Sequence, residues 1–458
     1  MIRVENHTAR SHHVAIVGSG PSGFYAAAAL LDAADSDSGL DVRVDMYDRL
    51  ATPWGLVRAG VAPDHPKIKS VSSQYDKTAE REGFRFFGHV SLGEDVTRDE
   101  LLERYDAIVY AVGSQTERRL GIPGEDLPGS IASVDFVGWY NGHPDFVDLA
   151  PPLDTERAVV IGAGNVALDV ARMLLLPEAD LRATDTADHA LDALVGSGVR
   201  EALICGRRGP REAAFTTTEL RELADIDDLA VVVDPEQVPA GIADDDTLPK
   251  GTRRNLDILR GFAENGPDPD AGHRMEFRFY RSPVEIRGDG KVEEIVLGIN
   301  RLETGEDGRT RAVDTGERET VPTGLVLRAV GYKGLALPDV PFDESSGTVP
   351  HTEGRIDGDE HTREYVVGWI KRGPTGIIGT NKKDANETVR HVLADLAERE
   401  PIEHADDIEA WLRDRCPDLV DQAGWRAIDE HERGRGEPHG RPRVKVVSRD
   451  ELIKLSRP

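Results

Sequence analysis

The chain has 458 residues, a formal net charge of −28 at pH 7 and two cysteines. That length allows two or three domains with sizeable cores, and the acidic charge argues against nonspecific binding to nucleic acid or anionic membranes. Cys205 and Cys416 lie far apart, which excludes a disulfide framework, a paired-cysteine metal site and a reactive dithiol. No apolar run reaches membrane-spanning length and no signal peptide is recognisable, so we expect a cytoplasmic protein without membrane insertion.

The first predicted element is a buried parallel strand that ends at Val17 and is followed by a glycine-rich turn and an Ala-rich helix. The turn has the spacing G-x-G-x-x-G, with Gly18, Gly20 and Gly23 as its glycines and Pro21 between them. Gly18 allows the tight turn, Gly20 leaves room for a pyrophosphate, and Gly23 lets helix and strand pack closely. Because free N–H groups at a helix N-terminus attract phosphate, this stretch predicts a dinucleotide site rather than an empty turn.

A second parallel strand is predicted over 42–47, after an extended polar loop at 32–41. The strand ends at Asp48, and an acid at this place can accept hydrogen bonds from a ribose. Asp45 is the alternative acid, but it lies inside the strand and is less suited to face a ligand.

The stretch 52–67 combines glycines and prolines with aromatic and basic residues, which predicts an irregular loop shaped around a flat ligand. His65 in this loop is either a polar surface residue or a catalytic group. A helix over 67–83 and a strand over 84–92 are expected next, with Val90 near the end of the strand.

A second fingerprint follows the apolar strand 158–161 and opens a helix that extends to about residue 176. Its spacing is G-x-G-x-x-A, with Gly162, Gly164 and Ala167 at the defining positions. One such motif is a weak signal, but two in one chain, each between a strand and a helix, predict two nucleotide sites.

The second fingerprint lies between two strands with similar endings, 108–113 and 325–331. The strand that follows it, 199–205, is succeeded by Arg207 and Arg208 rather than by an acid. A guanidinium pair at this place suits the 2′-phosphate that distinguishes NADP from NAD, although two solvated surface arginines are the alternative. The two sites therefore predict two different dinucleotides, most simply FAD and NADP(H).

A helix over 211–228 is expected to carry Glu219 and Glu222 on neighbouring turns. The pattern over 275–327 is rich in strand and turn signals and predicts a meander. Between them a basic helix is either a solvated face or a docking surface, and its cations are Lys250, Arg253, Arg254 and Arg260.

The C-terminal part begins with a strand over 365–368 and a loop in which Gly376 and Gly379 permit close backbone approach. A helix is predicted from Asp384 onward, with its N-terminus available to a cofactor. The tail is expected to hold helical pieces at 408–413 and 424–432 and a strand at 443–447, and residue chemistry alone indicates no role for it.

Taken together, these motifs resemble the adrenodoxin-reductase-like family of ferredoxin–NADP reductases, including its mycobacterial members. The resemblance covers essentially the whole chain and is carried by the segments 53–67, 206–209 together with 214–217, and 368–381. It implies an α/β fold of two Rossmann-like dinucleotide-binding domains, with the NADP domain inserted into the FAD domain. The implied segments are 1–113 for the first part of the FAD domain, 114–324 for the NADP domain, and 325–458 for the rest of the FAD domain with a C-terminal extension.

The resemblance also implies site residues, and no metal is expected among them. His65, Asp169 and Glu222 would lie near the nicotinamide and isoalloxazine rings. Relatives usually carry Glu where this chain has Asp48, so the ribose contact is expected to be weaker. Beyond the fingerprint glycines and Pro21, the implied flavin contacts are Asp48, Leu56, Val90, Trp369, Gly376, Ile377 and Ile378, and the implied NADP contacts are Asn165, Val166, Arg207, Arg208, Glu219 and Gly376.

The implied activity is that of a flavoprotein in electron transport, which takes a hydride from NADPH onto FAD and passes electrons singly to a ferredoxin-type iron–sulfur protein. No nucleophile is needed, so His65 and Asp169 are interpreted as positioning or proton-handling groups. The basic helix is the candidate docking surface for the iron–sulfur partner. An NADPH-dependent flavin monooxygenase and a nucleotide-binding subunit of a larger redox complex remain as alternatives.

Overall fold

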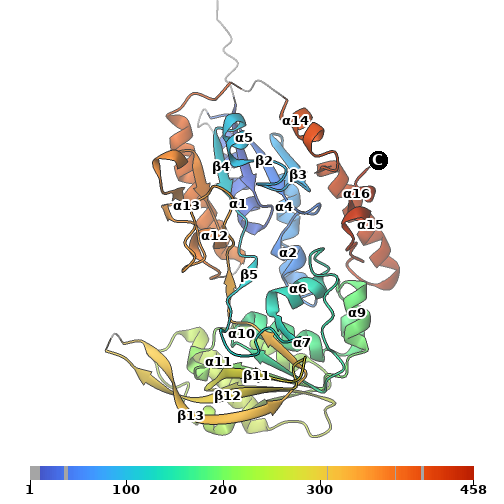
Figure 1. The fold of residues 1–458 in the computed structure, drawn as a ribbon, viewed down its shortest axis with the longest axis vertical. Helices are drawn as coiled ribbons and strands as arrows, with labels where there is room; N and C mark the ends of the chain where they lie inside the picture. The colour runs from blue at the N-terminus through green and yellow to red at the C-terminus, as the bar shows by residue number, and fades with distance from the viewer. Residues whose placement is uncertain (1–10, 36–39, 307, 377, 404–406, 458) are drawn as a thin grey trace, which may run out of the picture.

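The computed structural model describes residues 11–35, 40–306, 308–376, 378–403 and 407–457. Two α/β units lie one above the other along the long axis of the molecule (Figure 1). Within the described ranges, no helix is long and apolar enough to cross a membrane.

The first unit is built on an eight-stranded sheet that combines both ends of the chain. Its five central strands are parallel, because β1 pairs with β2 and β4, β2 with β3, and β4 with β18. In sheet order the strands are β16 (His351–Thr352), β17 (Arg355–Ile356), β18 (Glu364–Val366), β4 (Ala107–Tyr110), β1 (His12–Val17), β2 (Val42–Asp48), β3 (Phe84–Gly88) and β19 (Val420–Asp421).

Helices cover both faces of this sheet. The packed pair α1 (Pro21–Ala34) and α13 (Ile378–Ala397) buries one apolar face, while α5 (Arg98–Arg104) and α14 (Ile408–Arg415) cover the other. Tail helices α15 and α16 lie along one side of the unit (Figure 1). The remaining helices here are α2 (Leu56–Ala59), α3 (Pro66–Lys69), α4 (Ser72–Ala79), α12 (Trp369–Arg372), α15 (Gln422–Gly436) and α16 (Arg449–Leu455), with short 3-10 turns η4 (Asp359–His361) and η5 (Glu437–His439).

The second unit is built on a six-stranded, wholly parallel sheet. In order its strands are β6 (Ser130–Ala132), β14 (Leu325–Arg328), β7 (Arg157–Ile161), β8 (Glu201–Gly206), β10 (His273–Phe279) and β9 (Leu229–Val233). Its helices are α6 (Ser133–Asn141), α7 (Asn165–Leu175), α8 (Glu178–Arg182), α9 (Asp188–Val195), α10 (Thr217–Glu222) and α11 (Lys250–Asn265), with 3-10 turns η1 (Pro210–Glu212), η2 (Leu223–Asp225) and η3 (Pro235–Gln237).

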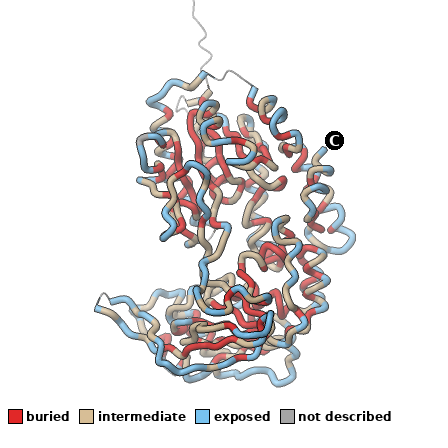
Figure 2. The backbone as a smooth tube through the Cα atoms, viewed as in Figure 1, coloured by how far each residue is buried: buried red, intermediate tan, exposed pale blue. Residues whose placement is uncertain are grey.

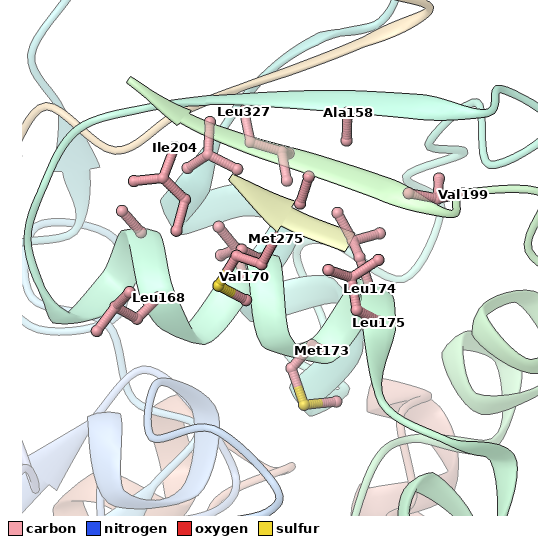
Figure 3. Packing of buried hydrophobic residues seen from close by; sticks show 14 of the residues in the cluster. Ala158, Leu168, Val170, Met173, Leu174, Leu175, Val199, Ile204, Met275 and Leu327 are labelled. Atoms are coloured by element: carbon pink, nitrogen blue, oxygen red, sulfur yellow. The ribbon is translucent and has the colours of Figure 1, made fainter. Parts of the chain in front are cut away.

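The core of the second unit has two layers. On one face of the sheet, Val170 and Leu174 of α7 face the strands that carry Ile204 and Met275, while Met173 points away from the sheet (Figure 3). On the other face, buried strand residues meet an antiparallel sheet of β11 (Arg281–Arg287), β12 (Glu294–Thr304) and β13 (Thr310–Pro322). Buried residues are concentrated in the two sheets of the upper and lower units (Figure 2).

The two units are connected where the chain leaves and re-enters the first unit. The connecting segments β5 (Thr116–Glu117) and β15 (Tyr332–Lys333) pair with each other as a small antiparallel ribbon. The predicted fold class is therefore confirmed: the chain is α/β, with one Rossmann-like unit inserted into another.

Several predicted boundaries are wrong for local physical reasons. The 213–216 segment leaves the predicted 211–228 helix because Ala214 N–H donates to Ala163 O and Thr216 N–H to Asn165 Oδ1. The predicted 67–83 helix is divided near Ser70 into α3 and α4, and the Ser70 hydroxyl donates a hydrogen bond to Lys67 O.

Other element ends also differ from the prediction. The loop 52–67 contains the short helix α2 and the start of α3, and α1 runs to Ala34, into the expected loop 32–41. Strand β3 ends at Gly88 rather than at 92, and α13 begins at Ile378 rather than Asp384. Of the expected meander 275–327, only β11–β13 are antiparallel, because β10 and β14 join the parallel sheet. The stretch 443–447 is not a strand, since its backbone bonds to Glu432 instead of to a neighbouring strand.

Candidate functional site

The first fingerprint turn is packed as its glycines predict. Gly18 has φ +110° and Gly23 lies so close to it that an added Cβ would be 2.1 Å from Gly18 O. Gly20, which caps α1, has only Gly55 Cα near such an added atom, at 3.9 Å. Backbone N–H groups at this helix N-terminus therefore border open space where a pyrophosphate can lie.

Asp48 lies at the end of β2 beside this turn, as predicted. Its Oδ2 accepts hydrogen bonds from Ser19 N at 2.9 Å and Ser19 Oγ at 2.5 Å, and its Oδ1 accepts from Leu50 N at 2.9 Å. A carboxylate has about four acceptor positions, so about one remains for a ribose hydroxyl group. Asp45, the alternative, is buried and paired with Arg85, at 2.7 Å for each of two contacts.

The loop after β2 closes over the fingerprint. Trp54 N–H donates to Ser19 O at 2.9 Å, and Gly55, at φ +51°, approaches Gly20 so closely that its added Cβ would be 2.8 Å from Gly20 Cα. Leu56 opens α2 and is half-buried, while Val90 is buried just beyond β3 and donates its N–H to Asp48 O.

The C-terminal segment reaches the same turn from the other side. Gly368, at φ +76°, leaves no room for a side chain because an added Cβ would be 2.0 Å from Ser22 Oγ. Trp369 follows, and its buried indole Nε1 has no hydrogen-bond partner within the described residues. An unpartnered buried donor beside a glycine-built turn suits a polar ligand such as a flavin. Gly376 and Ile378 lie at the start of α13, whereas Ile377 is outside the described residues.

The second fingerprint has the same construction. Gly162 has φ +144°, and an added Cβ would be 2.2 Å from Ala329 O. Gly164 caps α7, and nothing lies within 4 Å of such an atom, so there is free space beside this residue at the start of the helix. Asn165 holds the 213–216 segment through its Oδ1, and Val166 is half-buried beside it.

Arg207 and Arg208 follow β8 next to this turn. Arg207 is exposed and Arg208 is half-buried. Across the ranges that the structure covers, neither guanidinium has an ion-pair or hydrogen-bond partner, although the backbone carbonyls of both residues accept bonds from Asn300 and Tyr280. Two guanidinium groups without a partner among the described residues are chemically suited to bind an anion.

The three predicted catalytic residues meet at the junction of the two units. His65 Nε2, from the first unit, is 3.0 Å from Glu222 and 3.4 Å from Glu219, both on α10 of the second. Glu219, predicted as a nucleotide contact, thus belongs to this cluster. Asp169 joins it through Arg172, a residue that sequence reasoning missed.

Arg172 is the centre of the cluster. Its guanidinium is 2% exposed and lies 2.8 Å from His65 Nε2, 2.9 Å from Asp169 and 2.5 Å from Asp64. Nothing in the sequence distinguishes Arg172 from other helical arginines, apart from its apolar neighbours Met173 and Leu174, which indicate a buried helix face.

Burial and charge act in opposite directions on the acids of this cluster. Burial favours the neutral form of Asp64, but Arg172 overcomes it and lowers the pKa of that carboxyl. Burial raises the pKa of Asp169 despite Arg172. Burial first, and then the Asp169 carboxylate, also raise the pKa of Glu219.

His65, Asp169 and Glu219 are spaced closely enough to hold a metal ion. Arg172, however, contacts all three, at up to 3.5 Å, and supplies the positive charge there. We assign no metal to this cluster.

The basic helix is observed as α11. Lys250 and Arg254 are exposed and have no ion-pair partner in the described part of the chain. Arg253 is paired with Asp246 at 2.5 Å, and Arg260 lies 3.4 Å from Glu264, so only part of the predicted basic charge is free.

Two Rossmann-like units, each with a fingerprint turn, meet at the polar cluster around Arg172, an arrangement typical of oxidoreductases that bind two dinucleotides. A family model described as pyridine nucleotide-disulphide oxidoreductase matches residues 12–204. The NADPH-ferredoxin reductase FprA of Mycobacterium tuberculosis is 57% identical, covering 97% of this chain and 99% of the relative. The mitochondrial NADPH:adrenodoxin oxidoreductase of Homo sapiens is 39% identical, covering 97% and 92%.

The solved structure of Mycobacterium tuberculosis FprA in complex with NADPH matches with a TM-score of 0.95 at 56% identity, covering 98% of this chain and all (100%) of that one. The chain therefore belongs to the family of NADPH-ferredoxin and NADPH:adrenodoxin reductases, which are oxidoreductase enzymes, and the resemblance found in the sequence is confirmed. Cys205 and Cys416 are separately buried free thiols, so the disulphide chemistry in the name of the family model has no dithiol here.

Proposed function

We propose that this enzyme uses bound FAD to take electrons from NADPH and to pass them to a ferredoxin-type iron–sulfur protein. The observation that carries the proposal is the cluster around Arg172. It joins residues of the two units, and each unit carries one fingerprint turn. Such a junction is where two dinucleotides bound to the two turns would meet.

We propose that the first unit, built from the chain before β5 and after β15, holds FAD. The pyrophosphate would lie on the N-terminus of α1 between Gly20 and Pro21, and the ribose on Asp48. Leu56, Val90, Trp369, Gly376 and the start of α13 would surround the rest of the cofactor. FAD, when bound, accepts a hydride from a nicotinamide and releases electrons one at a time.

We propose that the second unit, whose parallel sheet includes β14 (Leu325–Arg328), holds NADPH. Gly162, Gly164, Asn165 and Val166 would receive the pyrophosphate. Arg207 and Arg208, which have no acidic partner among the described residues, would receive the 2′-phosphate.

His65 and its carboxylate partners would position the rings and handle protons. His65 Nε2 faces one guanidinium and two carboxylates, so its orientation is fixed from several sides. Glu222, whose side chain is 43% exposed, connects the cluster to solvent and gives a path for protons.

One spectrum and one titration test the proposal. The purified protein is expected to show flavin absorbance and to be bleached anaerobically by NADPH, much more slowly by NADH. Reduced enzyme is expected to pass electrons to cytochrome c only when a ferredoxin is present. A colourless protein that cannot be reconstituted with FAD refutes the proposal, and NADPH oxidation coupled to oxygenation of a substrate would indicate a monooxygenase instead. Bound nucleotide with negligible turnover would indicate a binding subunit.

We propose α11 as the ferredoxin-docking surface, through its unpaired cations Lys250 and Arg254. Reversing both charges, Lys250→Glu with Arg254→Glu, is expected to raise the KM for ferredoxin and flatten its salt dependence, because electrostatic steering is lost. Lys454→Glu, an exposed change on α16, is the matched control. Unchanged ferredoxin kinetics in the double variant would discard this surface. The cytoplasmic location stays a prediction from the sequence.

A further inference from the structure

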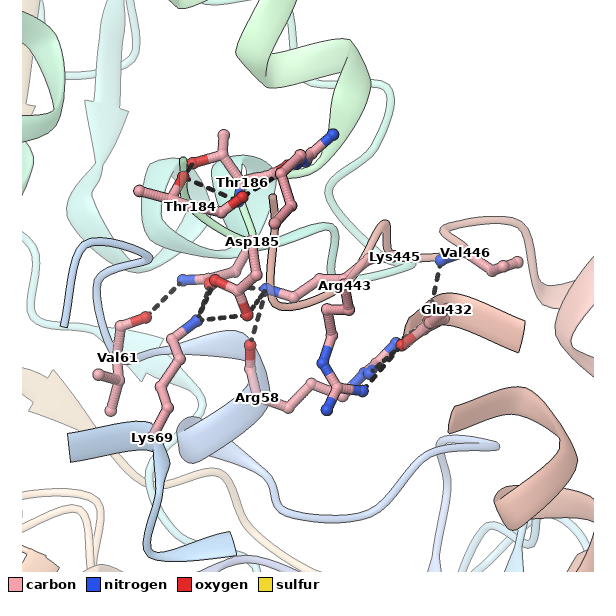
Figure 4. A network of polar contacts seen from close by, with 12 residues as sticks. Arg58, Val61, Lys69, Thr184, Asp185, Thr186, Glu432, Arg443, Lys445 and Val446 are labelled. Carbon is pink, nitrogen blue, oxygen red and sulfur yellow. Dashed lines mark hydrogen bonds and ion pairs between the residues drawn. The ribbon is translucent and has the colours of Figure 1, made fainter. Parts of the chain in front are cut away.

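The C-terminal tail, for which the sequence indicates no role, runs between the two units. The stretch 441–446 passes beside the loop that carries Arg58 and Lys69 in the first unit and beside Thr184, Asp185 and Thr186 in the second (Figure 4). It is therefore in contact with both halves of the molecule at once.

Lys445 makes the most central of these contacts. Its side chain is 1% exposed, and its Nζ lies 3.2 Å from Asp185 Oδ2, 3.0 Å from Asn141 Oδ1 and 3.2 Å from Arg58 O. Lys69 binds the same two partners, at 2.7 Å from Asp185 and 3.1 Å from Asn141. Two ammonium groups from different segments thus share one carboxylate and one amide of the second unit.

Glu432 anchors the other end of the tail. Its side chain is fully buried and accepts two bonds from the Arg58 guanidinium, at 2.8 and 2.5 Å, and one from Val446 N–H at 2.9 Å. Arg443 lies 3.1 Å from the same carboxylate and stacks over Trp54. Arg58 and Trp54 belong to the loop that also places Gly55 against Gly20 and carries His65.

The buried charged side chains of this network can all pair with one another in only one alignment of the tail. Burial lowers the pKa of both Lys445 and Lys69, and although burial alone would raise the pKa of Asp185, the two ammonium groups hold it below its usual range. Buried charges are costly unless they are paired, so the tail has one register in which every group is satisfied. An apolar contact of the same size would tolerate sliding, whereas these directional bonds do not.

We propose that Lys445 and Glu432 are positioning residues, which lock the loop 54–69 of the first unit to helix α6 and to the connection between α8 and α9 in the second. This lock fixes the angle at which the two nucleotide-binding turns face each other. This inference rests on the proposed function for its catalytic consequence only. The lock holds the units whether or not nucleotides are bound. The reaction depends on it because a misplacement of about 1 Å between reacting groups can slow a reaction by about 100-fold.

The test compares Lys445→Met with Lys454→Met, the same chemical change on an exposed residue of the same tail. Spin labels on Glu398→Cys and Glu317→Cys, exposed positions in the first and second units, report the distance between the units, because both native cysteines are buried. The parent and Lys454→Met are expected to give one narrow distance distribution, and Lys445→Met a broader or shifted one. In the FAD-loaded protein, Lys445→Met is expected to keep FAD and its Kd for NADPH, while flavin reduction at saturating NADPH slows about tenfold or more.

Arg441→Ala is the second variant, in case Lys445→Met does not fold. Arg441 donates to Thr184 O at 3.0 Å and to Asp188 at 2.7 Å. Because Asp188 is half exposed, removing the Arg441 guanidinium leaves no buried charge unpaired there. A smaller broadening is expected. An unchanged distance distribution overturns the lock, and so does a broadened one with unchanged flavin reduction, or loss of FAD from Lys445→Met. A colourless protein with the expected distances would instead refute the proposed function and leave the lock standing.

Discussion

Replacing Arg207 and Arg208 together with alanine tests whether the second fingerprint is built for a phosphorylated ribose. Both guanidinium groups follow β8 beside the N-terminus of α7 and have no acidic partner in the described ranges. Their removal therefore breaks no ion pair inside the protein, and any loss of binding reports on the ligand.

The size of the effect follows from the bonds that the 2′-phosphate would lose. A hydrogen bond to a charged group contributes about 1.5–3 kcal/mol, and exposed groups belong at the lower end. Two such contacts amount to about 3 kcal/mol, which corresponds to an increase of about 100-fold in the KM for NADPH. The KM for NADH, which lacks the phosphate, is expected to change less than about threefold.

Steady-state reduction of ferricyanide with each nucleotide measures both constants in one assay. Arg221→Ala, an exposed arginine on α10 without a partner in the described chain, controls for the loss of positive charge alone. An equal rise of KM for NADPH and NADH, or the same rise in the control, would show that the arginines do not bind the phosphate.

Three further predictions concern other parts of the molecule. His65→Ala is expected to retain FAD and to slow flavin reduction by about tenfold, less than the loss of an obligatory proton-transfer group; release of flavin during purification would contradict this positioning role. Burial raises the pKa of Glu117 to about 7, so the stability that its protonated form contributes is present below about pH 4.5 and is lost as the pH rises through 7. Glu117→Gln should therefore reduce the fall in Tm between pH 5 and pH 8, and an identical fall in parent and variant would refute the shift. Gly23→Ala, whose methyl group would meet Gly18 O at 2.1 Å, should lower the Tm strongly, whereas Gly261→Ala in α11 has nothing within 4 Å and should leave or raise it; equal Tm changes would contradict the packing argument.

The parts of the site that could be predicted are those encoded locally. The turns at Gly18 and Gly162 need φ values of +110° and +144°, which strongly favour glycine, so the spacing of the glycines specifies the geometry. The place of Asp48 was also predictable, because it ends a strand that the sequence indicates. Arg207 and Arg208 were predictable because they occupy the corresponding place after the second fingerprint.

The parts that could not be predicted depend on contacts between distant segments. Arg58 and Glu432 are separated by 374 positions, and neither lies in a pattern that marks it as buried. Arg172 reads as an ordinary helical arginine, yet it gathers acids from three segments. Predicted helix boundaries were likewise wrong where a distant side chain accepts a backbone hydrogen bond, as Asn165 does from Thr216 N–H.

The connection between the units explains why such distant contacts are needed. The chain passes from one unit to the other through β5 and β15, a ribbon of two residues on each side, which by itself leaves the units free to rotate. The cluster around Arg172 joins the units near the predicted nicotinamide position, and the network around Lys445 joins them along the tail. A rotation about the ribbon would have to separate Arg172 from Asp64 and Lys445 from Asp185 together, leaving buried charges without partners. Electron transfer between two bound dinucleotides depends on their spacing, and two separate polar junctions hold that spacing more firmly than the short ribbon alone.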